Sequence, residues 1–171
     1  MKLGTVFLLP MLLHEEGWEA IPSDIVKWIQ QCDVFFVENE KTTRRYFKKL
    51  WKEMVIENYS WFPIHKIEVD QISIFTESLK AGKNIGIISE AGCPGVADPG
   101  AELVALAHTQ NIKIVPLVGP SSILLSLMAS GFSGQEFSFH GYLPRERKDR
   151  IKKLKDFEMD TKRTGKTHIF M

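Results

Sequence analysis

Two stretches poor in bulky side chains are places where a ligand could be bound. The first, "IISEAGCPGVADPG" at residues 87–100, runs from a strand-like apolar pattern into a helix-start pattern through glycines and other small residues. The second, "PLVGPSS" at residues 116–122, follows the next apolar strand pattern along the chain. Such loops leave backbone N–H and C=O groups open, and ligands of open α/β sheets bind at the carboxyl ends of strands. We therefore expect the two loops to line a crevice at neighbouring strand ends, although an ordinary tight strand-to-helix connection would also account for the glycines.

Several other chemistries are excluded by spacing. The dinucleotide fingerprint G-x-G-x-x-G would follow the first strand, where residues 9–11 instead read LPM. The GKT run at residues 165–167 is similar to the end of a phosphate-binding loop, but Asp160 replaces the glycine required before it. The chain has no G-x-S-x-G nucleophile motif. Its five histidines are scattered, so we expect them to be surface or satisfied residues, and we expect no metal site.

Apolar and β-branched runs alternate with segments of helical period along the chain. The predicted strands lie at residues 5–9, 33–37, 54–59, 84–88, 112–117, 136–142 and 167–171. The predicted helices lie at residues 41–54, 71–79, 121–130 and 145–157, and two more begin at Pro22 and Asp98. Most strands are uniformly apolar, which favours a mostly parallel sheet with helices on both faces. The fold class is therefore α/β.

Finer expectations concern two helices and the domain boundary. Asp98 and Pro99 form a helix-start signature, so we expect Asp98 to cap this helix and Pro99 to occupy its first turn. The 121–130 helix is apolar nearly all round, which predicts that it is buried. We place a boundary between an N-terminal domain, residues 1–131, and a second α/β domain that begins at 132–171. Because the sequence ends within an apolar strand pattern, we expect the second domain to be incomplete in this chain.

The composition of the chain says more about its cellular location than about its binding partner. The 22 Lys and Arg nearly balance the 21 Asp and Glu, so net charge does not argue for or against nucleic acid. With two cysteines, Cys32 and Cys93, no disulfide framework is implied, and a reducing, cytoplasmic location fits best. The apolar run at residues 3–13 is followed by two glutamates and predicts a buried strand rather than a signal peptide. The uncharged stretch at residues 114–135 contains prolines, glycines and serines, which indicate a strand, turn and helix rather than a membrane span.

Three stretches, taken in order, resemble a known family. They read NIGIISEAGCPGVADPG at residues 84–100, IKIVPLVGPSS at 112–122 and FSFHGYLPRERKDR at 137–150. They resemble the tetrapyrrole methylase superfamily, the class III S-adenosylmethionine-dependent methyltransferases. The resemblance is strongest to the ribosomal RNA small-subunit methyltransferase I branch, which shows S-D-A-G-T-P-x-x-x-D-P-G, P-L-P-G-P and G-F-L-P at matching places. Three ordered motifs are more specific than any one of them.

The resemblance implies S-adenosylmethionine bound in a cleft between two α/β domains. Methyl transfer is an in-line displacement at a sulfonium, so catalysis can depend mainly on positioning and needs no metal. The resemblance also implies a homodimer. The composition of residues 114–135 leads us to expect no membrane association. The cofactor-binding residues that it implies are Met11 in a first loop, Gly92, Cys93 and Val96 in a second, Ser121, Ser122 and Ile123 in a third, and Phe170 and Met171 at the last strand.

The acceptor is left open because the first third of the chain departs from the family pattern. The family's T-P-I-G-N reads LPMLL at residues 9–13, and its E-D-T-R reads ENEK at residues 38–41. An acceptor hydroxyl must lose a proton, and the nearest charged side chains by position are His14, Glu38, Glu40 and Lys41. Of these, Glu38 and Lys41 are our catalytic candidates, although each would also fit a solvated surface.

Two basic helix faces, in residues 41–52 and 145–155, could bind phosphates. The resemblance implies ribosomal RNA or the small ribosomal subunit as the partner, and methylation of a ribose 2′-hydroxyl of small-subunit ribosomal RNA. Two alternatives remain. One is a tetrapyrrole methylase, since the carboxylates of a corrin or porphyrin also bind Lys and Arg. The other is a degenerate cofactor- or RNA-binding module without turnover.

Overall fold

The computed structural model describes residues 2–64 and 69–171, and the chain divides into two compact units, Met1–Pro120 and Ser121–Met171. The first unit contains β1 (Thr5–Leu8), α1 (Ile25–Ile29), β2 (Val34–Val37), α2 (Glu40–Leu50), β3 (Ser60–Pro63), α3 (Val69–Lys80), β4 (Ile85–Ile88), α4 (Ala101–Thr109) and β5 (Lys113–Pro116), with short 3-10 helices at Trp18–Ala20 and Ile56–Asn58. The second contains α5 (Ser122–Ser130), β6 (Phe137–Phe139), α6 (Arg147–Thr164) and β7 (Thr167–Ile169). The domain boundary near residue 131 stays a prediction.

The first unit is built on a five-stranded sheet in the order β3-β2-β4-β1-β5, in which all neighbours are parallel. β1 lies between β4 and β5, with Val6 opposite Ile85 on one side and Ile114 on the other. This arrangement confirms the predicted α/β fold with a parallel sheet. It also sets which loops meet at the carboxyl edge of the sheet.

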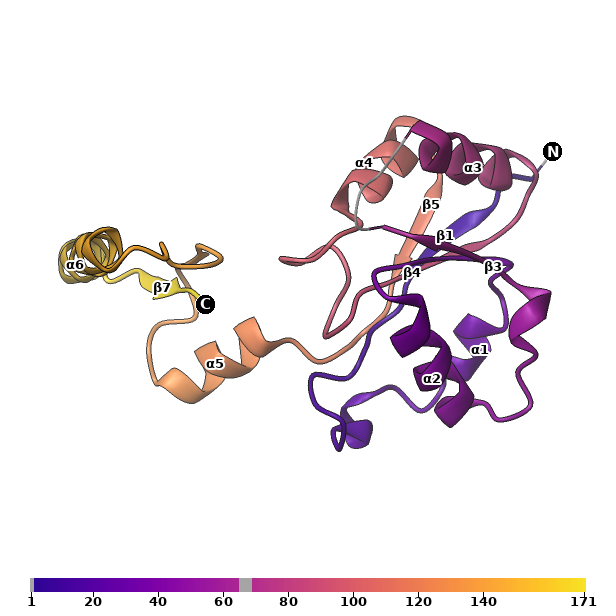
Figure 1. The fold of residues 1–171 in the computed structure, drawn as a ribbon. Helices are drawn as coiled ribbons and strands as arrows, with labels where there is room; N and C mark the ends of the chain where they lie inside the picture. Colours follow the sequence, from indigo (N-terminus) through magenta and orange to yellow (C-terminus); the bar gives the residue numbers. More distant parts are fainter. Residues whose placement is uncertain (1, 65–68) are drawn as a thin grey trace. The chain divides into compact units, whose positions relative to one another are not determined.

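Helices cover both faces of this sheet (Figure 1), with α1 and α2 on one face and α3 and α4 on the other. Consecutive residues of β2 point into the two separate cores. Phe35 packs against Phe47 of α2 with ring centroids 5.0 Å apart, and Phe36 packs against Phe75 of α3 at 5.4 Å. Such pairs contribute roughly 0.5–1.5 kcal/mol each beyond burial. The apolar runs of the strands are thus explained by burial on both faces.

α2 is shorter than the helix predicted at residues 41–54. It ends at Leu50, and the next residue is extended. The ammonium of Lys48 then donates to the backbone carbonyl oxygens of Lys52 and Met54, the latter at 2.9 Å. This turn brings the Met54 side chain into the core, where it is 1% exposed. The helical spacing of apolar residues continues to Met54 in the sequence, but in the structure a turn after Leu50, and not a further helical turn, buries the Met54 side chain.

The strand predicted at residues 54–59 is also displaced. Ile56–Asn58 is a 3-10 helix, and the strand follows it as β3, which pairs with β2. The β-branched residues Val55 and Ile56 suggested a strand, but the strand position is set by the register with β2, in which Val34 lies opposite Ser60.

The start of α4 corrects the expectation for Asp98 and Pro99. The N-cap is Gly100, which has φ +114 and no side-chain cap. Asp98 is not the cap, because the helix begins only at Ala101, after the left-handed Gly100. The inner face of α4 buries Leu103 and Ala107.

The second unit contains a parallel pair, β6 and β7, in which Phe139 lies opposite Ile169. α6 packs on this pair through Phe157, which is 7% exposed. α6 extends beyond the predicted end at residue 157, to a Gly165 C-cap at φ +74. The extra turns carry Asp160, whose carboxylate contacts His168 of β7.

α5 is a helix as predicted, but the expectation that it is buried is wrong. No residue of α5 is buried, and Leu124, Leu125 and Met128 are 52%, 51% and 78% exposed. The sheet of this unit has two strands, a surface too small to enclose a helix that is apolar nearly all round.

In the described part of the chain, no helix is long and apolar enough to cross a bilayer. The uncharged stretch at residues 114–135 is β5, a turn and α5, as its prolines and glycines indicated.

Candidate functional site

Three loops meet at the carboxyl edge of the first unit's sheet. β4 and β5, predicted to be neighbours, are separated by β1, so the loop after β1 lies between the other two. Met11 donates its backbone N–H to the carbonyl oxygen of Gly92 at 2.8 Å, and Leu117 donates to Leu8 at 3.1 Å. The loop after β1 is therefore hydrogen-bonded to the loop after β4, and β1 to the loop after β5.

The glycines at this junction are needed for packing between loops. A Cβ on Gly119 would lie 2.2 Å from the Cβ of Pro10, which is far inside contact distance. Gly92 has φ +67, and a Cβ there would lie 3.3 Å from the carbonyl oxygen of Pro120. At these two positions the loops are packed together rather than separated by an open crevice.

The open part of the second loop lies further along, at residues 95–97. The nearest atom to a Cβ on Gly95 would be 4.0 Å away, and Val96 is 49% exposed. Ala97 has φ +62, an uncommon conformation for a residue with a side chain. This short turn leaves backbone groups available, so it fits a ligand that is bound mainly through the main chain.

Cys93 lies in the same loop, and its thiol is not an activated nucleophile. Burial raises the pKa of the Cys93 thiol, and the negative charge of Asp98 raises it further, so the thiol is protonated at neutral pH. Its Sγ lies 3.5 Å from the carbonyl oxygen of Pro120. Cys93 thus helps to hold the loop after β4 to the loop after β5.

Glu38, a catalytic candidate, lies at the carboxyl end of β2 beside this loop. Its Oε2 accepts a hydrogen bond from the backbone N–H of Glu90 at 2.8 Å. Burial raises the pKa of Asp98, the negative charge of Glu38 raises it further, and the hydrogen bond with Ser89 partly offsets both. Three acidic residues, Glu38, Glu90 and Asp98, are therefore gathered around the start of the loop after β4.

The other charged candidates differ in how they are engaged. Glu40 pairs with Arg44 at 2.6 Å on the surface of α2. Lys41 is exposed in the first turn of α2 and forms no ion pair within the described residues. The helix is capped by Asn39, whose side chain accepts from the backbone N–H of Thr42 at 3.2 Å. The asparagine of the ENEK run thus has a structural role at the start of α2.

A pocket of about 290 Å³ opens between the loop after β1, α2 and the start of the loop after β4. Its lining residues are Met11, Leu12, Leu13, His14, Glu15, Trp18, Thr42, Arg45, Tyr46, Lys49, Glu90 and Ala91. Met11 and His14 were predicted near the site, but Glu38 and Lys41 are not among the lining residues. The aromatic wall formed by Trp18 and Tyr46 was not predicted.

The implied residues of the second unit have local roles of their own. Ser121 caps α5, its Oγ accepting from the N–H of Leu124 at 3.4 Å. Ser122 is exposed and Ile123 partly buried in the first turn of α5. Phe170 and Met171, which follow β7, are 39% and 44% exposed.

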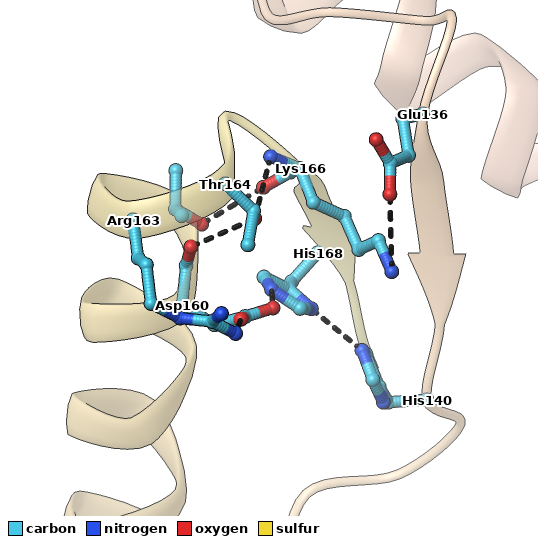
Figure 2. A network of polar contacts seen from close by, with 8 residues as sticks. Glu136, His140, Asp160, Arg163, Thr164, Lys166 and His168 are labelled. Atoms are coloured by element: carbon cyan, nitrogen blue, oxygen red, sulfur yellow. Dashed lines mark hydrogen bonds and ion pairs between the residues drawn. The ribbon is translucent and has the colours of Figure 1, made fainter.

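A histidine network joins β6, β7 and α6 within the second unit (Figure 2). His140 and His168 share a hydrogen bond between ring nitrogens 2.8 Å apart, and His168 Nε2 lies 3.0 Å from Asp160 Oδ2. Phe157 stacks on His168 at a centroid distance of 4.8 Å and makes a tilted contact with His140 at 4.3 Å. Burial lowers the pKa of His140, and repulsion from His168 lowers it further. These two histidines have satisfied partners, as expected from the sequence.

In the described residues, no group of three or more His, Cys, Asp or Glu side chains is arranged to hold a metal ion.

The profile of the family of tetrapyrrole (corrin/porphyrin) methylases matches residues 17–171. The chain belongs to this family. Ribosomal RNA small subunit methyltransferase I of Halalkalibacterium halodurans is 38% identical to this methylase-family chain, over 98% of the chain and 54% of the relative. The protein of the same name from Bacillus subtilis is 44% identical over 89% of the chain and 50% of the relative. The corresponding protein of Vibrio cholerae is 35% identical over 60% of the chain and 34% of the relative.

The chain spans about half the length of the two relatives that it matches over most of its own length. The family match confirms the resemblance carried by the three loop motifs. The individual cofactor-binding and catalytic residues stay predictions. Met11, Gly92, Cys93 and Val96 belong to the first unit, and the other implied residues belong to the second.

Proposed function

We propose that this chain is part of an S-adenosylmethionine-dependent methyltransferase that methylates a ribose 2′-hydroxyl of small-subunit ribosomal RNA. The observation that carries the proposal is the match of nearly the whole chain to the methylase family, together with its identity to relatives named ribosomal RNA small subunit methyltransferase I. We further propose that the protein acts in the cytoplasm as a homodimer.

S-adenosylmethionine fits the residues at the carboxyl edge of the sheet. The turn at residues 95–97 offers backbone groups beside the exposed Val96. The loop after β1 is joined to the same loop three residues before this turn, through the bond between Met11 and Gly92. We also propose Ser121, Ser122, Ile123, Phe170 and Met171 of the second unit as cofactor-binding residues, as the family resemblance implies. When bound, the cofactor supplies an electrophilic methyl group on a sulfonium.

The protein's own part in the reaction is positioning and removal of one proton. The acceptor oxygen would form a bond to the methyl carbon as the carbon–sulfur bond breaks and a neutral thioether leaves. Its O–H proton must also leave, so a nearby group must take the proton. We propose Glu38 for this role, because its carboxylate is fixed by the N–H of Glu90 and lies beside the cofactor loop. Lys41, exposed in the first turn of α2, would contact a phosphate of the acceptor or steer it by charge.

Calorimetry with S-adenosylmethionine tests the cofactor part. The structure makes Gly92 a poor test position, since its φ of +67 strains any side chain there. Val96 is better, because it is 49% exposed, and Val55, which is 50% exposed beyond α2, is a matched control. We expect Val96→Trp to weaken binding by more than about tenfold, which is about 1.4 kcal/mol, and Val55→Trp to leave it unchanged. Equal affinities for both variants would remove Val96 from the site, and no binding by the unaltered protein would contradict the cofactor.

A further inference from the structure

The pocket between the loop after β1 and α2 lies directly beside the proposed cofactor loop. It includes Met11, which is bonded to Gly92, and Ala91, which precedes Gly92. None of its polar side chains is explained by cofactor binding. A ligand assigned to this pocket would deepen the proposed function and rests on it.

One wall of the pocket is a fixed aromatic surface. Tyr46 is 3% exposed, and its hydroxyl donates to the carbonyl oxygen of Pro10 at 3.2 Å. Trp18 stacks on Tyr46 with ring centroids 5.8 Å apart and planes 27° from parallel. Because Tyr46 is held from behind by the core, Trp18 rests on a rigid support. Rings held in this way are suited to stacking a flat ligand.

The adjoining wall is cationic. Arg45 and Lys49 lie one turn apart on α2 and are exposed. Neither forms an ion pair within residues 2–64 and 69–171. Lys49 Nζ lies 5.4 Å from the centroid of Trp18, a contact that is weak at an exposed site and easily exchanged. Two such cations beside an aromatic ring suit a flat ligand that carries phosphate.

A hydrogen-bond acceptor, the carboxylate of Glu90, faces these two walls. Glu90 lies across the pocket, and its Oε1 accepts a hydrogen bond from the Thr42 hydroxyl at 3.3 Å. Its carboxylate can therefore accept a bond from an exocyclic amino group or a ribose hydroxyl. The volume of about 290 Å³ is at the small end of the roughly 300–1,000 Å³ range of ligand pockets, so it fits a single nucleotide better than a macrocycle.

We propose that this pocket binds one nucleotide of single-stranded RNA, with its base on Trp18 and a phosphate between Arg45 and Lys49. Lys49 moves from the ring face to the phosphate as the base stacks. The nucleotide is thereby held next to the loop that joins Met11 to Gly92, where an acceptor of the proposed reaction must lie.

The test is fluorescence anisotropy of a labelled, mixed-sequence ribohexanucleotide bound to the protein without cofactor, over a series of salt concentrations. Arg45→Gln with Lys49→Gln is compared with Lys27→Gln and Lys80→Gln, two exposed lysines of α1 and α3 that give the same change in net charge. The pocket pair should reduce the slope of log affinity against log salt by about 0.7 for each phosphate that is no longer bound. The control pair should leave the slope unchanged.

Trp18 is tested separately. Trp18→Ala should weaken binding by about tenfold, and Trp18→Phe, which keeps a stacking ring, should restore most of it. Arg45 and Lys49 are exposed, so their variants remain informative even if Trp18→Ala unfolds the protein. Thermal melting of every variant checks the fold.

Equal effects of the pocket pair and the control pair would overturn the pocket, as would binding of hexaglutamate as tightly as of RNA. Absence of RNA binding by the unaltered protein would also overturn it. The proposed function is judged independently, by methyl transfer to small ribosomal subunits. RNA binding through these residues without methyl transfer would support the pocket and contradict that function.

Discussion

Met11 donates its backbone N–H to the carbonyl oxygen of Gly92 at 2.8 Å, which joins two loops whose strands are adjacent in the sheet but far apart in the sequence. The loop after β5 completes the junction through Cys93 and Pro120. Any change that separates these loops should therefore affect both stability and cofactor affinity.

Gly119→Ala tests the junction. The added methyl group would lie 2.2 Å from the Cβ of Pro10, so the backbone of one loop must shift. We expect a loss of about 1–3 kcal/mol in the free energy of unfolding and weaker binding of S-adenosylmethionine. Chemical denaturation and calorimetry measure the two effects.

Gly134→Ala is the matched control, because its Cβ would meet a side-chain atom at an ordinary 3.8 Å. It should change the unfolding free energy by less than about 1 kcal/mol and leave cofactor affinity unchanged. A Gly119→Ala protein as stable as the Gly134→Ala protein would show that the loops are not tightly packed.

Asp98→Asn should stabilise the protein at pH 7. The pKa of Asp98 is raised in the folded state, so the folded protein binds more protons than the unfolded chain from the ordinary Asp range upward. The stability of the unaltered protein therefore falls as pH rises through this window. Asp98→Asn should raise the free energy of unfolding by less than about 1 kcal/mol at pH 7, as for partly exposed charges. The increase should vanish at acid pH, where Asp98 is neutral in both the folded and the unfolded state.

Urea denaturation from pH 3 to 7 would measure this gain. In a Glu38→Gln background the gain should shrink, because the negative charge of Glu38 is one of its causes. A gain that is the same at every pH would point to a cause other than charge.

The histidine network should make stability depend on pH near neutrality. The pKa of His140 is lowered in the folded state, so the unfolded chain binds more protons between the folded value and the ordinary value near 6.5. Stability should therefore rise with pH through this window and level off below it, where His140 is protonated in both states. The groups that act on His140 are His168, Lys153, Lys166 and Asp160.

NMR titration of the histidines gives the direct measurement. His140 should titrate below its ordinary range, and Asp160→Asn should lower its pKa further, because Asp160 is the one group in this set that raises it. A His140 that titrates at or above 6.5 would be inconsistent with the network.

If the acceptor is ribosomal RNA, α6 should supply phosphate contacts. Arg150 is occupied with the carbonyl oxygens of Pro144 and Arg145, and Lys153 lies over the ring of Phe157 at 4.9 Å. Lys148, Lys152 and Lys155 are exposed, share one face and are the better test. Reversing these three to Glu should flatten the salt dependence of binding to small ribosomal subunits by roughly one unit for each phosphate that is no longer bound. An unchanged slope would exclude this face.

The sequence predicted the elements whose residues are buried on both faces. β1, β2 and β4 are continuous apolar runs, and no other element type explains such short runs between helices. It failed where tertiary contacts decide. Asp98 has the chemistry of an N-cap, but α4 begins only after the left-handed Gly100. Met54 continues a helical period but is buried by a turn.

The candidate site was predicted in part for the same reason. The loops after β4 and β5 can be recognised in the sequence because each is a continuous run rich in small residues. The pocket cannot be recognised in this way, because Trp18, Tyr46 and Glu90 lie in separate segments of the chain. His140 and His168 meet only because β6 and β7 pair in parallel. A local sequence pattern does not show which strands pair. Arg45 and Lys49 of the pocket were predicted only as part of the basic helix face in residues 41–52.

Methyl transfer from labelled S-adenosylmethionine tests the central claim most directly. The protein would be offered small ribosomal subunits that lack the modification and, separately, a porphyrinogen, with Glu38→Gln assayed beside the unaltered protein. We predict label in a ribose 2′-O-methyl group of the small-subunit RNA, none in the porphyrinogen, and at least about a hundredfold slower transfer by Glu38→Gln. Label in the porphyrinogen alone, or transfer to neither acceptor by a protein that binds the cofactor, would contradict the account.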